Sequence, residues 1–382
     1  MAKRRKAPDY LFAHVGDVHL TSGARFAKTA TVMDWIVDDA LALGVKDFGV
    51  GGDLFGLTIP HRATPEEKLT MGRWLTRMPR AYLVEGNHDY PLDLALFELL
   101  DTEVVYSGRS QIRSWRPRET KVSFVLAPYP FKALWVGDDV PESIEEQNAL
   151  AATRYYEALR RVVEIEVEDK RTVVVLGHFN VAGSMVGGGE ILSGHEVELT
   201  IEQLEALPVA AILLSHIHKA QTLGTKIHYA GSPTAQSFGE QADRKCYLLC
   251  RVYGSEVEVE RRYTPAPILW TMDATYDGTW TVGWPIDDDW MEGSECRLRV
   301  TVPEHLAATA YTTEIETELA LKGVEKVVVE VKVVPQVMVR SEAISGAYSD
   351  QSRLDIWARL QDPPIDDAQL NRLHRCLLEL GG

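Results

Sequence analysis

The sequence predicts a layered α/β domain followed by a smaller domain of mixed helix and strand. Apolar strand-like runs alternate with helix-like runs, and the strand-like runs are apolar enough to be covered on both faces. After residue 262 the composition changes, and a separate β-α-β pattern begins near residue 295. A chain of 382 residues is also too long for one ordinary core, so two domains are expected.

The first predicted domain, residues 1–262, contains six apolar segments that we expect to be strands. They are 10–15, 47–52, 80–86, 121–130, 171–177 and 209–215. The intervening segments include runs with the length or the apolar spacing of helices. These are 29–44, 64–79, 142–168 and 200–207. Thr64 suits the N-cap of the second of these helices, and Pro65 suits its first position.

The rest of the chain predicts a connector, a small domain and a final pair of helices. Residues 263–290 are rich in Pro, Gly, Trp and Asp and lack periodicity, so we interpret them as a connector. Residues 291–345 would form the small α+β domain, with a strand, a helix and a second strand at 295–302, 303–323 and 324–334. Residues 346–382 predict two helices split by two prolines.

Composition and charge narrow the class of function. The net charge is −16, from 56 acidic and 40 basic residues, so the chain is a weak general binder of nucleic-acid phosphates. A role on DNA would need a local basic patch, bound cations or a partner. No run approaches the roughly 20 apolar residues that span a bilayer. Since no signal-peptide core follows the basic start, we expect a cytoplasmic protein without membrane association.

Polar side chains that can bind metal follow five of the predicted strands. Functional groups of layered α/β folds collect at the carboxyl ends of strands, so we expect these side chains to share one rim. They are Asp17, His19, Asp53, Asn87, His178, His216 and His218, and His88 and Asp89 follow Asn87 directly. Each residue alone would more often be a core histidine or a turn aspartate. Their repetition after five strands is what favours a functional site.

The donor set consists of carboxylate and amide oxygens and imidazole nitrogens, with no thiolate. Such a set suits Mn²⁺, Fe or Zn²⁺ better than Ca²⁺ or an all-oxygen Mg²⁺ site. There are too many donors for one ion with open positions. Two ions about 3.5–4 Å apart that share one carboxylate would use them all. The sequence therefore predicts a site for two divalent metal ions.

Several motifs resemble those of a known superfamily. "GDVH", "GGD", "GNHD", "GH" and "SHIH" are similar, in this order, to the five motifs of calcineurin-like metallophosphoesterases. "LAPYP" and "YAGSPTAQSFGE" narrow the resemblance to the SbcD branch, the nuclease subunit of the SbcCD complex, with its meiotic-recombination nuclease relatives. The resemblance implies a metallophosphoesterase β-sandwich flanked by helices. It extends more weakly to the β-α-β unit, which is similar to the small α+β capping domain of that branch.

The resemblance also implies a role for each metal-binding residue. One ion would be held by Asp17, His19 and His218. The other would be held by Asn87, His178 and His216. Asp53 would bridge both ions, for which we expect Mn²⁺.

Two further residues are implied to be catalytic. His88 matches the histidine that contacts the scissile phosphate or helps the leaving oxygen depart, and Asp89 would orient His88. The sequence departs from the branch at Ser215, where glycine is usual. It departs again at Gly56, where histidine or aspartate is frequent.

The activity implied by the resemblance is that of an Mn²⁺-dependent DNA exonuclease and endonuclease in an SbcCD-like repair and recombination complex. A water activated by two metal ions would hydrolyse the phosphodiester bond, without a protein nucleophile. Two alternatives stay open. One is a small-molecule metallophosphodiesterase acting on a cyclic nucleotide or a phosphomonoester, and the other is a non-catalytic scaffold of the same fold.

The implied partners are DNA and an SbcC-like ABC-type ATPase, onto whose coiled-coil base the C-terminal helices would dock. The resemblance also implies that the chain can form a homodimer. An apolar stripe on the last helix would suit either docking or packing within the chain. The stripe consists of Leu370, Leu373, Leu377 and Leu380.

Overall fold

The computed structural model describes most of the chain, which divides into two compact units. The described residues are 7–56, 62–109, 111–138, 140–186, 196–285, 291–335, 344, 346–347, 349–361 and 365–380. The first unit comprises Met1–Met272, Pro285–Arg297 and Ile315–Val328. The second comprises Asp273–Trp284, Leu298–Glu314 and Val329–Gly382.

Two six-stranded sheets form the centre of the first unit. One has the order β14-β13-β1-β2-β3-β4, and its strands β1 to β4 are parallel. Its strands are β1 (Tyr10–Val15), β2 (Asp47–Val50), β3 (Arg80–Val84), β4 (Glu103–Ser107), β13 (Cys246–Tyr253) and β14 (Glu256–Tyr263). The other has the order β11-β12-β10-β7-β6-β5, with β6, β7, β10 and β12 parallel. Its strands are β5 (Arg113–Trp115), β6 (Val122–Ala127), β7 (Thr172–His178), β10 (Ala211–Ser215), β11 (Gln221–Leu223) and β12 (Ile227–Tyr229).

The two sheets pack face to face through a buried apolar layer. Phe12 of β1 and Tyr82 of β3 contact Phe124 of β6, with ring centroids 5.1 Å and 4.6 Å apart. These rings belong to one buried cluster whose members come from both sheets. The layered α/β class predicted from the apolar strands is confirmed, as is the β-sandwich that the resemblance implies.

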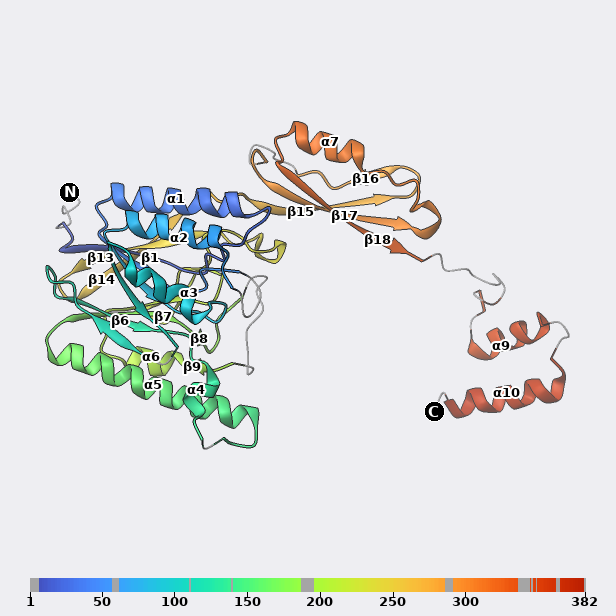
Figure 1. The fold of residues 1–382 in the computed structure, drawn as a ribbon. Coiled ribbons are helices and arrows are strands. Elements are labelled where there is room, and N and C mark those ends of the chain that lie inside the picture. Colours follow the sequence, from blue (N-terminus) through green and yellow to red (C-terminus); the bar gives the residue numbers. More distant parts are fainter. Residues whose placement is uncertain are drawn as a thin grey trace, which may run out of the picture. The chain divides into compact units, whose positions relative to one another are not determined.

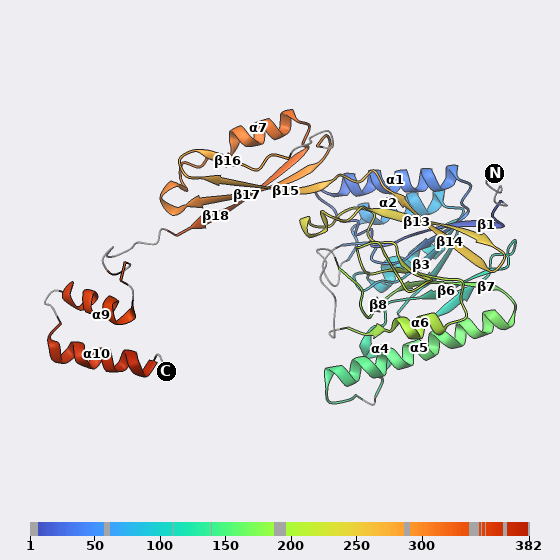
Figure 2. The same cartoon turned by 180° about the vertical axis from the view of Figure 1, so that it is seen from behind.

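Helices cover the outer faces of the two sheets (Figure 1). Residues of α1 (Phe26–Ala42) and α2 (Pro65–Arg77) share a core cluster with the first sheet. Residues of α5 (Ile144–Glu168) and α6 (Ile201–Ala206) share another with the second sheet. The reverse view shows the long helix α5 along the same outer face (Figure 2).

The start of α2 follows the local sequence signal. The Thr64 side chain accepts a hydrogen bond from the Glu67 backbone N–H, the Glu67 side chain accepts one from the Thr64 backbone N–H, and Pro65 occupies the first turn. The predicted cap is therefore confirmed, with a reciprocal capping box in addition.

Short elements complete the first unit. They are α3 (Pro91–Ala95), η1 (Leu96–Leu99), α4 (Lys132–Val136), the parallel pair β8 (Asn180–Val181) and β9 (Glu198–Leu199), and η2 (Phe238–Glu240). None of the helices within the described ranges is both long and apolar enough to cross a bilayer.

The segment predicted as a connector contains two strands, so that interpretation is wrong for its middle part. A four-stranded sheet has the order β16-β15-β17-β18. Its strands are β15 (Leu269–Tyr276), β16 (Trp280–Val282), β17 (Glu295–Pro303) and β18 (Lys326–Val334). In β15 the side chains of Met272 and Ala274 are buried while Asp273 and Thr275 are exposed. This alternation of buried and exposed residues covers only a few positions. It is hard to recognise in the sequence because Pro, Gly and Trp residues surround it.

The helix predicted at 303–323 begins later than expected. Residues Glu304–Leu306 form only the short helix η3, and α7 spans Thr313–Leu321. The Thr309 side chain and backbone N–H both donate to the Leu306 carbonyl, which closes a turn instead of continuing a helix. The two predicted C-terminal helices are present as α9 (Asp350–Arg359) and α10 (Asp367–Leu380). The predicted domain limits stay a prediction.

Candidate metal centre

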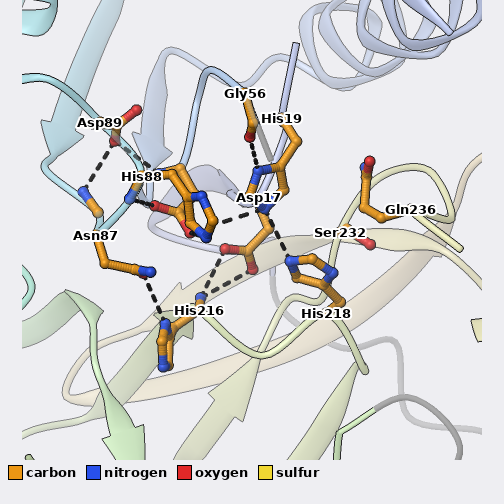
Figure 3. Close-up of polar contacts among 12 residues, drawn as sticks. Asp17, His19, Gly56, Asn87, His88, Asp89, His216, His218, Ser232 and Gln236 are labelled. Atoms are coloured by element: carbon orange, nitrogen blue, oxygen red, sulfur yellow. Dashed lines mark hydrogen bonds and ion pairs between the residues drawn. The ribbon is translucent and has the colours of Figure 1, made fainter. Parts of the chain in front are cut away.

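The side chains predicted from five strand ends converge on one site. Loops after β1, β2 and β3 of the first sheet and the ends of β7 and β10 of the second sheet supply them. Figure 3 shows Asp17, His19, His88 and His218 gathered in one place, with the His216 ring beside Asn87. The site therefore lies where the carboxyl ends of the two sheets meet.

The backbone at the site is held in an unusual conformation. Positive φ angles of 52°, 46°, 50° and 96° occur at Asp17, His19, Asp53 and His216. Among described residues other than glycine, only Lys170 also has a positive φ. Such a conformation costs about 1–3 kcal/mol per residue and concentrates at functional sites. At these four positions the positive φ angle turns the backbone away from the strand direction, so that the side chain faces the site.

Two glycines permit the close approach of the loops. A Cβ on Gly86 would lie 2.1 Å from Oδ1 of Asp53. Gly52 has a φ of +92°, and a Cβ there would lie 2.7 Å from Nδ1 of His178. Side chains at these positions would therefore displace residues of the site.

The first group of donors consists of Asp17, His19 and His218. One ligand atom of each lies within 4.8 Å of the other two. Nε2 of His19 lies 2.9 Å from Nε2 of His218. Two nitrogens about 2.1 Å from one ion at a right angle would be about 3 Å apart, so this spacing fits two ligands of one metal. The Asp17 carboxylate is fixed by the His216 backbone N–H, at 2.8 Å and 3.0 Å from its two oxygens.

The second group consists of Asp53, His178 and His216, again within 4.8 Å of one another, together with Asn87. Oδ1 of Asn87 lies 3.1 Å from Nε2 of His178 and 3.1 Å from Nδ1 of His216. Oδ2 of Asp53 lies 3.4 Å from Nε2 of His178 and 3.9 Å from Nε2 of His19. The Asp53 carboxylate thus faces donors of both groups.

Each of the four imidazoles in the two groups has its outer nitrogen paired with a hydrogen-bond acceptor. The pairs are Nδ1 of His19 with the Gly56 carbonyl, Nδ1 of His178 with the Gly51 carbonyl at 2.7 Å, Nδ1 of His218 with Glu240 at 3.0 Å, and Nε2 of His216 with Glu196 at 2.8 Å. An acceptor on the outer nitrogen places the proton there and leaves the inner lone pair for a metal. The residues present therefore fit divalent cations.

The sequence departure at Gly56 has a structural reason. Gly56 has a φ of +65°, and its carbonyl oxygen accepts the hydrogen bond from Nδ1 of His19. Glycine adopts this left-handed conformation without strain. At the second departure the Ser215 side chain packs on Gly16, where a Cβ would lie 1.8 Å from Oγ of Ser215.

Burial and the carboxylates act in opposite directions on the pKa values of the imidazoles at the site. Burial lowers the pKa of His19 to about 4, so its ring is neutral at pH 7. Burial would also lower the pKa of His178, but the Asp53 carboxylate outweighs burial and raises it to about 9. Burial opposes ionisation of Asp53, yet the neighbouring imidazoles, His178 first, lower its pKa below the usual range. The carboxylate thus attracts a proton that a divalent cation would replace.

His88 lies at the open side of the site, with its side chain 18% exposed and Nε2 3.9 Å from Oδ2 of Asp53. The expectation that Asp89 orients the His88 ring by a direct hydrogen bond is not met. The Asp89 oxygens accept from the backbone N–H groups of Asp53, Leu54 and Gly86 at 2.8, 2.9 and 3.0 Å. Nδ1 of His88 is buried and has no hydrogen-bond partner among the described residues. Asp89 therefore fixes the loops that carry Asp53 and His88, rather than the imidazole.

Sequence reasoning missed the two carboxylates behind the histidine pair. Glu196 and Glu240 do not follow a predicted strand, so the pattern that found the other residues could not find them. Glu240 ends the motif "YAGSPTAQSFGE", so this motif is the one sequence signal that points to it. A cavity of about 230 Å³ borders His216, His218 and Glu240 and leaves this side of the site open. His195, the residue just before Glu196, lies outside the described residues.

The chain matches one family model and, more remotely, several solved structures. A family model described as calcineurin-like phosphoesterase matches residues 10–220. No curated protein sequence matches the chain. A dimetal phosphatase from Danio rerio is 11% identical, with 67% of this chain and 96% of that chain covered and a TM-score of 0.43. The TT1561 structure from Thermus thermophilus is 14% identical over 66% and 98% of the two chains, with a TM-score of 0.37. Similarities this low add nothing to the assignment.

Proposed function

Because the chain belongs to the calcineurin-like phosphoesterase family, we propose that it is a two-metal phosphodiesterase that cleaves DNA, as the nuclease subunit of an SbcCD-like complex. The observation that carries the hydrolytic part is the position of Oδ2 of Asp53, 3.4 Å from a nitrogen of His178 and 3.9 Å from a nitrogen of His19. A carboxylate in this position suits a bridge between two neighbouring cations. The DNA substrate and the use of Mn²⁺ rest on the SbcD-like motifs.

The chain's residues would hold the two cations in the groups described above. Asp17, His19 and His218 form one set of ligands. The other set is Asn87, His178 and His216, with Asp53 shared between the two. When bound, two divalent cations neutralise charge on the phosphate and lower the pKa of a water toward neutrality. Imidazole and carboxylate ligands suit Mn²⁺, Fe or Zn²⁺, and the SbcD-like motifs favour Mn²⁺ among these ions.

His88 is the residue best placed to act on the substrate itself. Its ring is partly exposed beside the donor groups, whereas the His178 side chain is completely buried. A histidine in this place can donate a hydrogen bond to a phosphate oxygen and a proton to the departing oxygen. The backbone N–H of His88 donates to Oδ1 of Asp53 at 2.9 Å, which holds the ring close to the shared carboxylate.

Two arginine–aromatic pairs support a nucleic-acid substrate, and one of them involves Tyr90, two residues after His88. The Arg62 guanidinium lies 4.4 Å from the centre of the Tyr90 ring. The Arg109 guanidinium lies 4.2 Å from the centre of the Phe131 ring, and Arg109 also contacts the Asp89 carbonyl. Bases of single-stranded nucleic acid stack on aromatic and guanidinium planes. These pairs would receive nucleotides next to the cleaved phosphate.

A partner would supply the affinity for DNA that the acidic chain lacks. The net charge of −16 opposes binding to a polyanion. Helices α9 and α10 pack on one another, and Leu370, Leu373 and Leu377 of α10 are only partly buried. This surface would bind an SbcC-like ABC-type ATPase in the cytoplasm. The ATPase would then hold DNA close to the nuclease.

The test is a cleavage assay with Mn²⁺ on single- and double-stranded DNA, with and without the ATPase. It compares the wild type with His88→Ala and with His305→Ala, a control at an exposed histidine of η3. We expect His88→Ala to lose about 10²–10⁴-fold in turnover, the size of a general acid–base contribution, while keeping its metal. The control should cleave like the wild type.

Other outcomes would contradict parts of the proposal. Efficient cleavage of a chromogenic phosphodiester without any cleavage of DNA, even beside the ATPase, would favour a small-molecule phosphodiesterase. Purified protein without stoichiometric metal would favour a non-catalytic scaffold. Unchanged turnover in His88→Ala would remove His88 from the reaction.

A further inference from the structure

The segment Tyr229–Glu240 wraps around the loop that carries His218. The Ser232 backbone N–H donates to the His218 carbonyl at 3.1 Å. Gly231 has a φ of +72°, and a Cβ there would lie 2.8 Å from the same carbonyl oxygen. Only glycine allows this contact, so the segment is built to approach the His218 backbone. Figure 3 shows Ser232 and Gln236 on the loop beside His218.

The end of this segment places a buried carboxylate behind the His218 ring. Oε1 of Glu240 lies 3.0 Å from Nδ1 of His218, and Glu240 is only 7% exposed. The carboxylate accepts the Nδ1 proton, so the lone pair of Nε2 faces His19 across 2.9 Å. The alternative tautomer, with a proton on Nε2, could not bind an ion there.

A buried lysine fixes Glu240 from the other side. Lys245, also 7% exposed, places Nζ 2.5 Å from Oε2 of Glu240, 3.0 Å from Oγ of Ser232 and 3.1 Å from the His218 carbonyl. The Gln236 backbone N–H donates to Oε2 of Glu240 at 3.1 Å. The ammonium therefore has three acceptors and each Glu240 oxygen has a partner, which leaves the carboxylate little freedom to move.

Fold stability does not by itself account for this arrangement. Taking both charges of an ion pair out of water costs much of what their attraction returns, and apolar side chains of similar size often serve the fold as well. The pair is instead joined to one imidazole of the first donor group. The His216 ring of the second group has a weaker counterpart, since the side chain of its partner Glu196 is 35% exposed.

We propose that Glu240, held by Lys245, is a positioning residue that presents Nε2 of His218 to the cation of the Asp17, His19 and His218 group. This inference rests on the proposed function, because it takes that group to be a metal site. The new element is that the metal affinity of this group depends on the buried Glu240–Lys245 ion pair, although neither residue is a ligand. The second site depends on Glu196, whose charge is screened by water, so the two sites respond to different mutations.

The test is calorimetric titration of the metal-free full chain with Mn²⁺ alone. The variants are Glu240→Gln and, as a matched control at an exposed position of β14, Glu256→Gln. In Glu240→Gln the new amide would turn its oxygen to Lys245 and its NH₂ group to Nδ1 of His218, which favours the wrong imidazole tautomer. We expect two ions in the wild type and the control. In Glu240→Gln one ion should keep its Kd and the other should bind about 10–100-fold more weakly.

A structural readout identifies which site has changed. Anomalous diffraction at one equivalent of Mn²⁺ should show the variant's ion in the group of Asn87, His178 and His216. The melting temperature of the metal-free protein is measured beside it, because a merely structural role would lower this temperature without favouring either site. If Glu240→Gln does not fold, the apolar pair Glu240→Met with Lys245→Leu removes both charges together and should show the same selective loss.

The outcomes separate this inference from the proposed function. Two ions in the wild type with unchanged affinities in the folded variants would overturn the role of Glu240 and leave the dimetal proposal standing. Equal weakening of both sites would also overturn it. A wild-type protein that binds no Mn²⁺ would overturn both proposals at once.

Discussion

Oδ2 of Asp53 lies 3.4 Å from Nε2 of His178, although Asp53 follows β2 of the first sheet and His178 ends β7 of the second. This contact joins the two halves of the sandwich at the candidate metal centre. Both side chains are buried, so water does not screen their interaction. The site therefore depends on the two sheets keeping their mutual position.

Replacing the shared carboxylate should disable both donor groups. Asp53→Asn keeps the shape of the side chain but removes the charge that faces His178 and His19. We expect DNA cleavage to be lost and the Mn²⁺ affinity to fall by more than about 100-fold. Mutating a residue that only supports a metal ligand typically lowers metal affinity about 10–100-fold, and a direct ligand should matter more. Titration calorimetry measures this directly. Retention of two tightly bound ions in Asp53→Asn would contradict a bridging role.

Adding one methyl group at Gly86 should have a similar effect without touching a ligand. Its Cβ would lie 2.1 Å from Oδ1 of Asp53, so Gly86→Ala must displace the carboxylate. We expect weaker Mn²⁺ binding and loss of cleavage. The control is Gly72→Ala in α2, where the nearest atom would be 3.7 Å away and the helix should gain about 0.5–1 kcal/mol. Normal metal binding by Gly86→Ala would show that the loop contact is not needed.

Arg109 should matter for the position of the His88 loop. Its Nε donates to the buried Glu85 carboxylate at 2.6 Å, and Nη2 donates to the Asp89 carbonyl at 3.3 Å. Arg109→Gln should lower the free energy of unfolding by about 1–3 kcal/mol, because Glu85 loses a charged donor. We also expect a lower kcat with little change in Mn²⁺ affinity. Urea unfolding and steady-state kinetics measure the two effects.

The control for Arg109 is Arg113→Gln, which breaks an exposed contact of 3.3 Å with Glu98. Exposed pairs contribute about 0–1 kcal/mol, so this variant should behave like the wild type. Equal behaviour of the two variants would mean that Arg109 is only a surface residue.

The Glu166 carboxylate should make stability depend on pH in the acid range. Burial opposes its ionisation, but hydrogen bonds from Arg116, Ser114 and Ser123 outweigh burial and lower the pKa of Glu166. Its contribution is therefore complete above the unfolded glutamate value of about 4.3 and is lost as pH falls through the lower folded pKa. In Glu166→Gln we expect about 1–3 kcal/mol less stability at pH 7 and a flatter profile below that value.

Thermal unfolding from pH 7 to acid conditions measures this profile. The control is Glu164→Gln on the exposed side of α5, whose contact with Arg160 is worth about 0.3–0.5 kcal/mol. A wild-type profile as flat as that of Glu166→Gln would mean that the carboxylate is not bound as described.

The convergence of these side chains on one place could be predicted because their positions follow a local rule. Asp17, Asp53, Asn87, His178 and His216 stand directly after apolar runs, and parallel strands bring such positions to one edge. The cap of α2 was equally local, since Thr64 and Pro65 adjoin the helix that they start. In both cases the information lies within a few residues of the feature that it predicts.

Other features depend on contacts that sequence spacing does not contain. The pairing of Glu240 with His218 and Lys245 requires the loop after β12 to fold back on the loop after β10. The positive φ of His216 follows from the shape of the finished site and not from an intrinsic preference of histidine. The backbone partners of the Asp89 carboxylate, including the Leu54 N–H, become its neighbours only in the folded chain.

The most direct test of a dimetal centre is anomalous diffraction from a crystal of the protein soaked in Mn²⁺. The account predicts two peaks, one among Asp17, His19 and His218 and the other among Asn87, His178 and His216, with Asp53 in contact with both. A single peak, or two peaks of which only one touches Asp53, would contradict it.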